Sequence, residues 1–374
     1  MIKRIYDNLN DYIKPNKALI IYGPRRVGKT TLLQDYLSKT NFKYKLDNGD
    51  NIRLQNILKS QDFKKILAYA ESYELIAIDE AQQIPNIGMA LKILVDNIPN
   101  IRVIATGSSS FDLSQQIGEP LTGRKKTIVL YPFSQKELLF KFNKYELEEN
   151  LGDFLLFGSY PDVILSKSRK EKLSFLEELV NSYLLKDILS LDKVKSSSVL
   201  LNLLKLLSFQ VGSLVSLNEL SNTLKIDIKT VDRYLDLLEK SFIIFRLGGF
   251  SRNLRNEINS KAKYYFLDNG VRNAVISKYN TLENRDDIGQ LFENFIISER
   301  IKKCAYEQIY GSSYFWRNYA GQEIDLIEER DGKLLAYEIK WSKEKVSPPK
   351  DFVENYKNSE YQVINKDNYL GFIL

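Results

Sequence analysis

Short apolar segments alternate with amphipathic ones over the first 145 residues of the chain. Segments typical of buried strands lie at residues 18–22, 42–47, 74–79, 101–106 and 127–131. Between them, apolar residues recur at helical spacing, first from Lys29 to about Lys39. Strands that alternate with helices predict a parallel sheet with helices on both of its faces.

The pattern changes in the middle of the chain, where strand signals vanish. Apolar residues recur at helical spacing through 175–189 and 199–209, which predicts a helical subdomain. Residues 217–244 then read as a short helix, a turn near 226–227, a second helix over 228–240 and a strand. That order predicts a helix-turn-helix with a wing.

A last change of pattern begins after Asn284. A helix is expected over 288–302, and strands are expected over 314–328 and 333–341. The second strand follows a turn at Asp331-Gly332, a dipeptide that favours tight hairpins. The chain therefore ends in a region of mixed helix and strand.

The amino-acid composition excludes several kinds of catalytic and metal site, but it says less about the fold. At 374 residues the chain is too long for one ordinary domain, and we expect two or three. It has no histidine and a single cysteine, Cys304. This excludes an internal disulfide, Ser-His-Asp or Cys-His nucleophilic machinery, and histidine-bound zinc or iron. The remaining chemistry uses carboxylates, lysine, arginine, hydroxyl groups and a hard, oxygen-seeking metal.

The sequence predicts no membrane association. The N-terminus lacks the apolar stretch of a signal peptide, and the longest apolar runs, near 128–133 and 200–209, are short or interrupted by polar residues. Because no internal disulfide can form, we expect a cytoplasmic protein. The net charge of +6, from 54 basic and 48 acidic residues, is compatible with nucleic acid but too small to argue for it alone.

Residues 23–30 form the most specific motif in the chain. They read Gly-Pro-Arg-Arg-Val-Gly-Lys-Thr and fit the phosphate-loop pattern G-x-x-x-x-G-K-[ST] between a predicted strand and a predicted helix. The glycines let successive backbone N–H groups surround a β-phosphate at the positive end of the helix. Lys29 is expected to reach the β- and γ-oxygens, and Thr30 to offer its hydroxyl to Mg²⁺.

The expected nucleotide-binding residues are Gly23, Pro24, Arg25, Arg26, Val27, Gly28, Lys29, Thr30 and Thr31. The alternative is a chance match in a glycine turn.

Two adjacent acids, Asp79 and Glu80, end the predicted strand at 74–79. Neighbouring carboxylates at a strand end are costly unless a cation neutralises them, so Asp79 is expected to hold Mg²⁺ through water. Glu80 is then expected to orient and deprotonate the attacking water, which favours hydrolysis over phosphoryl transfer to a metabolite. The alternative is a pair of solvated acids.

Two further residues are candidates for contact with the γ-phosphate. Ser108 follows the predicted strand at 101–106 in Thr106-Gly-Ser and could touch the γ-phosphate or the attacking water. Arg124 precedes the fifth predicted strand and could stabilise transition-state charge as an arginine finger, in the same chain or in a neighbouring copy. The alternatives are a serine-rich turn and a solvated loop arginine.

The predicted helix at 228–240 does not settle whether the chain binds DNA. In a DNA-reading geometry, Lys229, Thr230 and Arg233 would face the major groove. The same helix also contains acids that would repel phosphate: Asp232, Asp236 and Glu239. Many such helices instead serve as rigid connectors or lids, so both readings stay open.

Four polar residues near the C-terminus form a second candidate site. Glu338 and Lys340 lie two apart on one face of a predicted strand, Asp325 lies on the strand before it, and Glu293 lies on the preceding helix. Two carboxylates can bind Mg²⁺, and a lysine can position an attacking water. The alternative is a pair of amphipathic strands with charged outer faces, although carboxylates among Ile, Leu, Tyr and Ala are expensive to bury unpaired.

These motifs together resemble a known family, the AAA-type ATPases common in archaea and bacteria. The likeness rests on residues 23–30, 79–80, 106–108, 121–125, 130–137, 158–161 and 183–187, and on the C-terminal acids, whose arrangement is similar to the PD-(D/E)xK nuclease pattern. In that pattern Asp325 is the central acid, Glu338 and Lys340 are the E-x-K pair, and Glu293 matches the helix acid.

The resemblance implies an α/β fold in four parts. These are a P-loop NTPase core with a parallel sheet at 1–148, a helical lid at 149–198, a winged helix at 199–280 and a small restriction-endonuclease-like α/β domain of the DUF4143 type at 281–374. It also implies that the nucleotide is ATP.

Three functional hypotheses follow. The first is a Mg-dependent ATPase coupled to DNA binding or processing, with nuclease activity at the C-terminal site. The second is a nucleotide-operated switch that recruits a protein partner, or associates with its own copies, through an inactive nuclease-like domain. A small-molecule kinase is the third, and the two adjacent acids suit it poorly.

Overall fold

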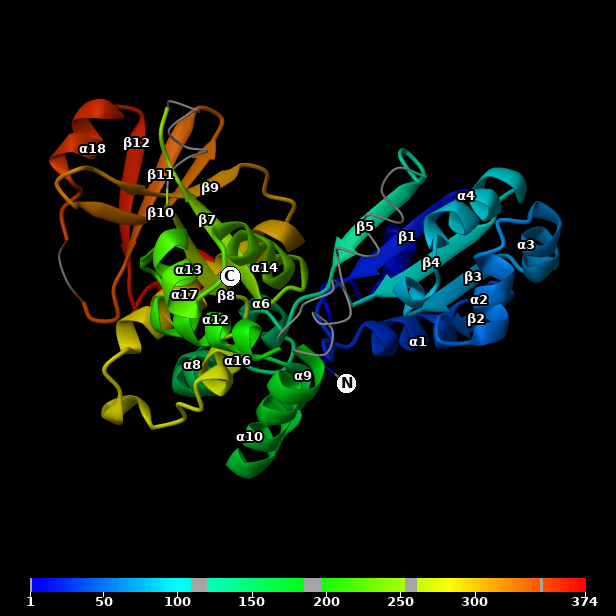
Figure 1. Cartoon of the computed structure of the whole chain (residues 1–374), viewed down its shortest axis with the longest axis horizontal. Helices are drawn as coiled ribbons and strands as arrows, with labels where there is room; N and C mark the ends of the chain where they lie inside the picture. The colour runs from blue at the N-terminus through cyan, green and yellow to red at the C-terminus, as the bar shows by residue number, and fades with distance from the viewer. Residues whose placement is uncertain (1, 109–119, 185–196, 253–260, 344–345) are drawn as a thin grey trace. The chain divides into compact units, whose positions relative to one another are not determined.

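The computed structural model describes residues 2–108, 120–184, 197–252, 261–343 and 346–374. The described residues form two compact units (Figure 1). The first unit comprises Met1–Phe133 with Lys240–Phe242, and the second comprises Ser134–Glu239 and Ile243–Leu374. The boundaries expected at 148, 198 and 280 all fall within the second unit, and they stay predictions of functional parts.

The first unit is built on a parallel sheet. Over its described residues the sheet has the order β2-β3-β4-β1-β5, and every neighbouring pair is parallel. The strands are β1 (Lys17–Tyr22), β2 (Tyr44–Asn48), β3 (Leu75–Asp79), β4 (Arg102–Gly107) and β5 (Lys125–Val129). Each lies within about two residues of its predicted position. The central strands are mostly apolar because both of their faces are buried.

Helices cover this sheet as the alternating pattern predicts. They are α1 (Lys29–Lys39), α2 (Ile52–Leu58), α3 (Phe63–Ala70) and α4 (Ile87–Asn97), with short 3₁₀ turns η1 (Leu9–Asp11) and η2 (Ala81–Gln83). Apolar residues of α2, α3 and α4 share one core with Ile20 of β1, Ile78 of β3 and Ala105 of β4. Strand residues of opposite parity, such as Leu19, are also buried, and α1 packs against β4. The sheet is therefore a rigid platform whose carboxyl edge can present side chains.

The second unit begins with a run of helices. These are α6 (Gln135–Leu138), α7 (Lys144–Glu149), α8 (Leu151–Phe157), α9 (Pro161–Leu165), α10 (Arg169–Glu178), the π-helical η3 (Leu179–Leu184) and α12 (Ser197–Phe209). The helix expected over 175–189 is thus the end of α10 followed by η3, and its last residues lie outside the described part. The helical subdomain is present as the spacing predicts.

The region expected to be a helix-turn-helix follows β6 (Leu214–Val215). Helix α13 (Leu217–Leu224) ends at Lys225 in the left-handed conformation, and α14 (Ile228–Lys240) begins at its predicted residue. Strands β7 (Ile244–Gly249) and β8 (Ala262–Phe266) follow, and both β6 and β7 pair antiparallel with β8. The winged-helix assignment itself stays a prediction.

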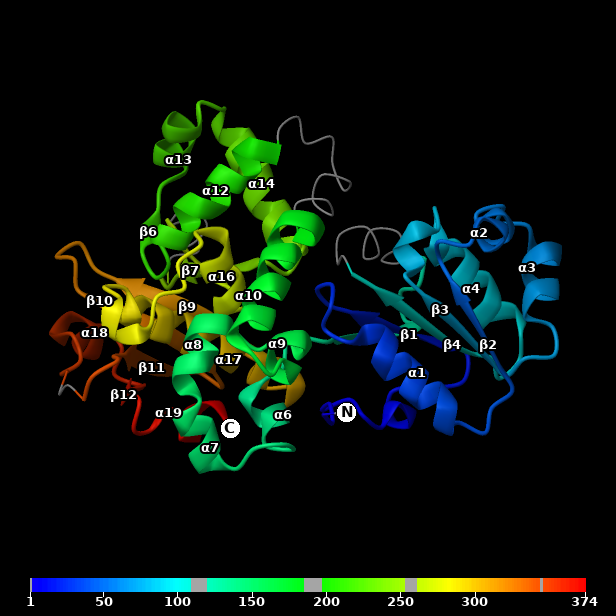
Figure 2. The same cartoon turned by 90° about the horizontal axis from the view of Figure 1, so that it is seen from below.

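The C-terminal elements continue the same sheet rather than forming a separate one. They are α16 (Asn269–Val275), η4 (Leu282–Asn284), α17 (Ile288–Tyr306), β9 (Ser312–Arg317), β10 (Glu323–Arg330), β11 (Lys333–Ile339), α18 (Lys350–Asn355), β12 (Ser359–Ile364) and α19 (Tyr369–Ile373). Over the described residues the strand order is β12-β11-β10-β9-β7-β8-β6. Strands β7 and β9 join parallel, with Gly248 opposite Tyr314. Figure 2 shows this sheet behind α12, α16 and α17.

The single strand expected over 314–328 is wrong, because the chain turns between β9 and β10. Gly321 adopts a left-handed φ of 84°, and its N–H donates to the carbonyl of Asn318 at 3.1 Å. This tight turn divides the segment into two antiparallel strands. The second turn, at Asp331-Gly332, has positive φ at both residues, as a tight hairpin requires.

The motif at 158–161 has a structural role. Gly158 has a φ of 72°, and a Cβ there would lie 1.9 Å from the Asp268 carboxylate. Asp268 accepts hydrogen bonds from the backbone N–H of Ser159 at 2.7 Å and of Val271 at 3.1 Å, which ties α9 to the start of α16. Only glycine fits this close approach.

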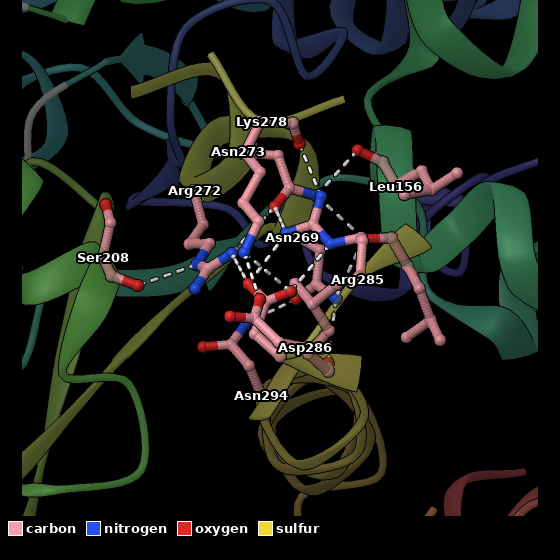
Figure 3. A network of polar contacts seen from close by, with 12 residues as sticks. Leu156, Ser208, Asn269, Arg272, Asn273, Lys278, Arg285, Asp286 and Asn294 are labelled. Carbon is pink, nitrogen blue, oxygen red and sulfur yellow. Dashed lines mark hydrogen bonds and ion pairs between the residues drawn. The ribbon is translucent and has the colours of Figure 1, made fainter. Parts of the chain in front are cut away.

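A buried ionic network holds α16, α12 and α17 together (Figure 3). The Asp287 carboxylate accepts hydrogen bonds from Arg285 Nε at 2.8 Å and from Arg272 Nη1 at 2.6 Å. Arg272 also donates to the carbonyl of Ser208, and Asn273 donates to the carbonyls that end α8. Burial alone would raise the pKa of Asp287, but hydrogen bonds from the two arginines outweigh it and lower the pKa below its usual value.

Replacement of Asp287 by alanine is expected to destabilise the second unit by about 3–5 kcal/mol, because two buried arginines lose their counter-ion. Urea unfolding would measure this loss. The neighbouring Asp286 pairs with Lys278 but is 89% exposed, so Asp286→Ala should destabilise the protein much less. Equal losses in the two variants would contradict the prediction. Because the pKa of Asp287 is lowered, its stabilisation should persist above the ordinary Asp pKa and fade only in more acidic solution.

None of the helices in the described ranges is long and apolar enough to cross a membrane.

Candidate functional site

The phosphate-loop residues lie at the carboxyl end of β1 and the start of α1. Gly23 leaves β1 with a φ of 149°, and a Cβ there would meet the Leu130 carbonyl at 2.0 Å. Gly28 takes a left-handed φ of 94° directly before the helix. Lys29 is 5% exposed, and its ammonium donates to the carbonyls of Gly23 at 2.9 Å and Pro24 at 2.7 Å. The loop is therefore closed around the lysine, with the first turn of α1 beneath it.

The other expected loop residues frame this arrangement. Val27 is buried, which anchors the loop in the core, while Arg26 is exposed and has a φ of 63°. Arg25 is half-buried, and Thr31 is exposed in the first turn of α1. A left-handed residue other than glycine is uncommon and costs about 1–3 kcal/mol, so the surrounding fold holds the loop in its shape.

Asp79 meets Thr30 across the sheet edge. The Thr30 hydroxyl donates to Asp79 Oδ2 at 2.8 Å, although 49 residues separate them in the chain. The Thr106 hydroxyl donates to the other oxygen, Oδ1, from β4, the strand between β3 and β1. Asp79 is 7% exposed. Hydroxyl and carboxylate oxygens thus converge beside the loop, which is the donor chemistry that Mg²⁺ prefers.

Glu80 is held in an unusual backbone conformation next to Asp79. Its φ of 50° and ψ of 44° are left-handed, and its N–H donates to the Thr106 hydroxyl at 3.1 Å. A Cβ at Gly49 would come within 2.1 Å of the Glu80 carbonyl, so the glycine lets β2 approach. Strain of this kind collects at functional sites.

Gln82 connects Glu80 with Ser108. Its side-chain amide donates to Glu80 Oε2 at 2.5 Å and to the Ser108 hydroxyl at 3.1 Å. Ser108 is 7% exposed at the end of β4. Sequence reasoning missed Thr106, Gln82 and Gly49 as parts of this arrangement. Thr106 could have been found from its place at the end of a predicted central strand, but nothing in the pattern marks Gln82.

Arg124 lies at the opposite edge of the sheet. Its carbonyl accepts from the N–H of Ala18 at the beginning of β1, whereas the loop follows the end of that strand. The separation along the strand is about 13 Å at 3.3 Å per residue. The Arg124 side chain pairs with Asp96 near the end of α4 at 2.5 Å. The structure therefore does not bring Arg124 to the phosphate loop of its own chain.

The C-terminal acids gather around a lysine that sequence reasoning missed. Lys263 of β8 has a fully buried side chain, and its ammonium lies 3.7 Å from both Glu293 Oε1 and Asp325 Oδ1. It also forms an ion pair with Glu323 at the start of β10. The signal for Lys263 was a charged residue within an apolar strand, which is costly unless it is paired.

Local structure aims Asp325 at this centre. The register of β10 against β9 shifts between Ile324 and Ile327, a bulge that redirects the intervening side chains. Asp325 Oδ2 accepts from the N–H of Ile339 at 2.9 Å. On β11, Glu338 pairs with Lys340 at 2.6 Å. The structure thus brings together Glu293 and Asp325, with the Glu338–Lys340 pair on the adjoining strand.

Burial controls ionisation in this centre. Burial, followed by the nearby Asp325 carboxylate, raises the pKa of Glu293 above its ordinary value. Burial alone would lower the pKa of Lys263, but Glu293, Asp325 and Glu323 outweigh it and raise the pKa. The lysine is therefore the stable positive charge at the centre. Across the described residues, no three side chains of His, Cys, Asp or Glu are arranged to hold a metal ion.

The chain is similar to several uncharacterized proteins. Relatives at 24–28% identity include an uncharacterized protein of Haemophilus influenzae, at 26% identity over 97% of this chain and 89% of its own. An uncharacterized protein of Methanocaldococcus jannaschii is 28% identical over 87% of this chain and 76% of its own. One of Mycobacterium tuberculosis is 25% identical over 86% of this chain and 70% of its own.

Three family models match successive parts of the chain. Residues 148–282 match a domain of unknown function, DUF8612. Residues 15–139, which hold the phosphate loop and both adjacent acids, match the AAA domain, and residues 288–370 match a second domain of unknown function, DUF4143. The chain thus combines an AAA domain of the P-loop type with a C-terminal DUF4143 domain.

Proposed function

We propose that the AAA domain binds ATP with Mg²⁺ and hydrolyses it. The observation that supports this most directly is the hydrogen bond between Thr30 and Asp79 at 2.8 Å. It joins the end of the phosphate loop to an acid on another strand, where a triphosphate gripped by the loop would place its metal. Thr30 and Asp79 would hold Mg²⁺, and the ion would neutralise charge on the β- and γ-phosphate oxygens.

Lys29 exchanges partners when nucleotide binds. Its ammonium donates to the Gly23 and Pro24 carbonyls, and phosphate oxygens are stronger acceptors because they are charged. Moving the ammonium to the β- and γ-oxygens replaces neutral partners with charged ones. The loop N–H groups and the end of α1 complete the anion site.

Glu80 acts as the general base on the attacking water. Gln82 donates to its Oε2, which orients the carboxylate and leaves the other oxygen to accept a proton from water. Ser108, which accepts from the same amide of Gln82, would contact the water or the γ-phosphate. Gln82 is a positioning residue in this scheme, since it acts through Glu80 and Ser108.

Calorimetry with purified protein and Mg-ATP tests the proposal, with phosphate release measured in parallel. We expect one nucleotide per chain, binding weakened by EDTA, and ADP and phosphate as the products. A parallel titration with Mg-GTP tests the choice of base, which rests on the family likeness. Absence of binding to either nucleotide would refute the proposal.

If Arg124 contributes to turnover, it must do so in a neighbouring copy. In dilute, monomeric protein Arg124→Ala should change turnover by no more than about twofold, because the variant loses only an exposed pair with Asp96. Specific activity measured across a dilution series checks this. A loss of 10³-fold or more in the monomer, the size of an arginine-finger effect, would contradict it.

We infer that the second unit is a nucleotide-operated interaction module and that DNA processing is the rival. The exposed side of α14 lines a cavity of about 720 Å³ that mixes both signs of charge, with Lys229, Arg233, Arg246 and Lys261 beside Asp232, Asp236 and Glu239. A DNA backbone would meet those acids, so the mixed charge suits a protein surface better than phosphate. ATP turnover with a panel of duplex, branched and single-stranded DNA separates the two. Strong stimulation by any of them would favour DNA.

A further inference from the structure

We propose that Lys263 is the resident cation of the C-terminal carboxylate centre and that this centre excludes a divalent metal. The PD-(D/E)xK likeness implies a Mg²⁺ ion held by Asp325 and Glu338. The residues present do not fit that ion, because the chain itself supplies the positive charge.

The first reason is the position of the ammonium. Lys263 Nζ lies 3.7 Å from Glu293 Oε1 and 3.7 Å from Asp325 Oδ1, and it pairs directly with Glu323. Its side chain is 0% exposed. A metal bound to these oxygens would need to approach them to about 2.0–2.6 Å, within a few ångströms of the ammonium. Two cations so close in a buried site repel strongly.

The second reason is that the acids are already bonded within the protein. Asp325 Oδ2 accepts from the Ile339 N–H at 2.9 Å, and Glu293 accepts from the Tyr265 hydroxyl at 2.7 Å. Glu338 pairs with Lys340 at 2.6 Å. The remaining acid, Glu323, pairs with Arg317 at 3.3 Å as well as with Lys263. A metal would have to break several of these contacts.

The elements that carry Lys263 and its partners indicate a structural role for the centre in place of metal binding. Lys263 comes from β8, whereas its partners come from α17 and β10. A further contact comes from Gly212, where a Cβ would lie 2.8 Å from Glu293 Oε1. The centre therefore ties β8 to α17 and to β10, and without a metal it supplies no water activation for phosphodiester cleavage.

A manganese titration of the full chain without nucleotide tests the proposal. Mn²⁺ bound is counted by electron paramagnetic resonance in the unmodified protein and in Asp325→Asn, so that any ion at the phosphate loop is common to both. We expect the same amount of Mn²⁺ in the two proteins. A Mn²⁺ site that Asp325→Asn or Glu338→Gln removes from the unmodified protein would overturn the proposal.

Removal of the lysine should create the site. Lys263→Met is expected to bind one additional Mn²⁺ per chain, and Lys263→Met with Asp325→Asn should lose it. Lys261→Met is the matched control, because Lys261 is exposed two residues away and should bind as the unmodified protein does. A folded Lys263→Met that binds no additional Mn²⁺ would count against the proposal. If that variant does not fold, the comparison with Asp325→Asn still decides the matter.

Discussion

Lys29→Ala is expected to weaken Mg-ATP binding by about 100-fold or more. The ammonium is expected to donate to oxygens of the β- and γ-phosphates, and each charge-assisted hydrogen bond contributes about 1.5–3 kcal/mol. Loss of two such bonds corresponds to about 3–6 kcal/mol, which is at least 100-fold in affinity. Calorimetry or displacement of a fluorescent nucleotide would measure it.

The control for this prediction lies on the same helix. Lys39 is at the other end of α1, pairs with Asp35 at 2.6 Å and is 66% exposed. Lys39→Ala should therefore leave nucleotide affinity unchanged. Because Lys29 also donates to the Gly23 and Pro24 carbonyls, thermal unfolding of both variants is needed to separate a lost contact from a disordered loop. Affinity of folded Lys29→Ala within threefold of the unmodified protein would remove the basis of the proposed function.

Glu80→Gln should separate binding from hydrolysis. The amide keeps the size of the carboxylate and can still accept a hydrogen bond from Gln82, so Mg-ATP affinity should change little. It cannot accept a proton from water, and general-base catalysis contributes about 10²–10⁴-fold. Phosphate release under single-turnover conditions should fall by that factor, with ATP retained on the protein.

Glu74 provides the comparison for Glu80. It lies directly before β3, is exposed, and accepts a hydrogen bond from the Lys43 N–H at 2.8 Å. Glu74→Gln makes the same chemical change at the far end of the same strand, so single-turnover hydrolysis should continue at the original rate. Normal hydrolysis by Glu80→Gln would show that another group activates the water.

The proposed role of Lys263 and the proposed role of the phosphate loop are independent of each other. In the proposed function the loop uses a metal for hydrolysis, whereas the C-terminal centre contains an ammonium from β8. Failure of Mg-ATP binding would leave the metal exclusion intact, and a manganese site at Asp325 would leave the ATPase intact. Together they suit a protein in which one unit handles nucleotide and the other forms contacts.

Local patterns predicted most of the fold. The strands of the first unit, the start of α14 at Ile228 and the Asp331-Gly332 turn follow from side-chain periodicity and turn chemistry, which act between near neighbours in the chain. The misread segment at 314–328 contains a local turn signal that the prediction overlooked, because the residues around Gly321 are mostly polar and Gly321 itself has a positive φ.

The phosphate loop was readable from the sequence because its parts are contiguous. A grip built from backbone N–H groups needs only glycines, a lysine and a threonine at set spacing, and residues 23–30 provide them. The acids at 79–80 were readable because a central strand ends there. In both cases the chemistry is encoded within a few residues.

Tertiary structure alone decided which distant residues meet. Thr106 reaches Asp79 because β4 lies between β3 and β1, and Arg124 is excluded because β5 starts where β1 starts. Lys263 enters the C-terminal centre only because β7 pairs with β9 and brings β8 into the same sheet. Strand order and register are set by packing over the whole chain, so no local pattern contains them.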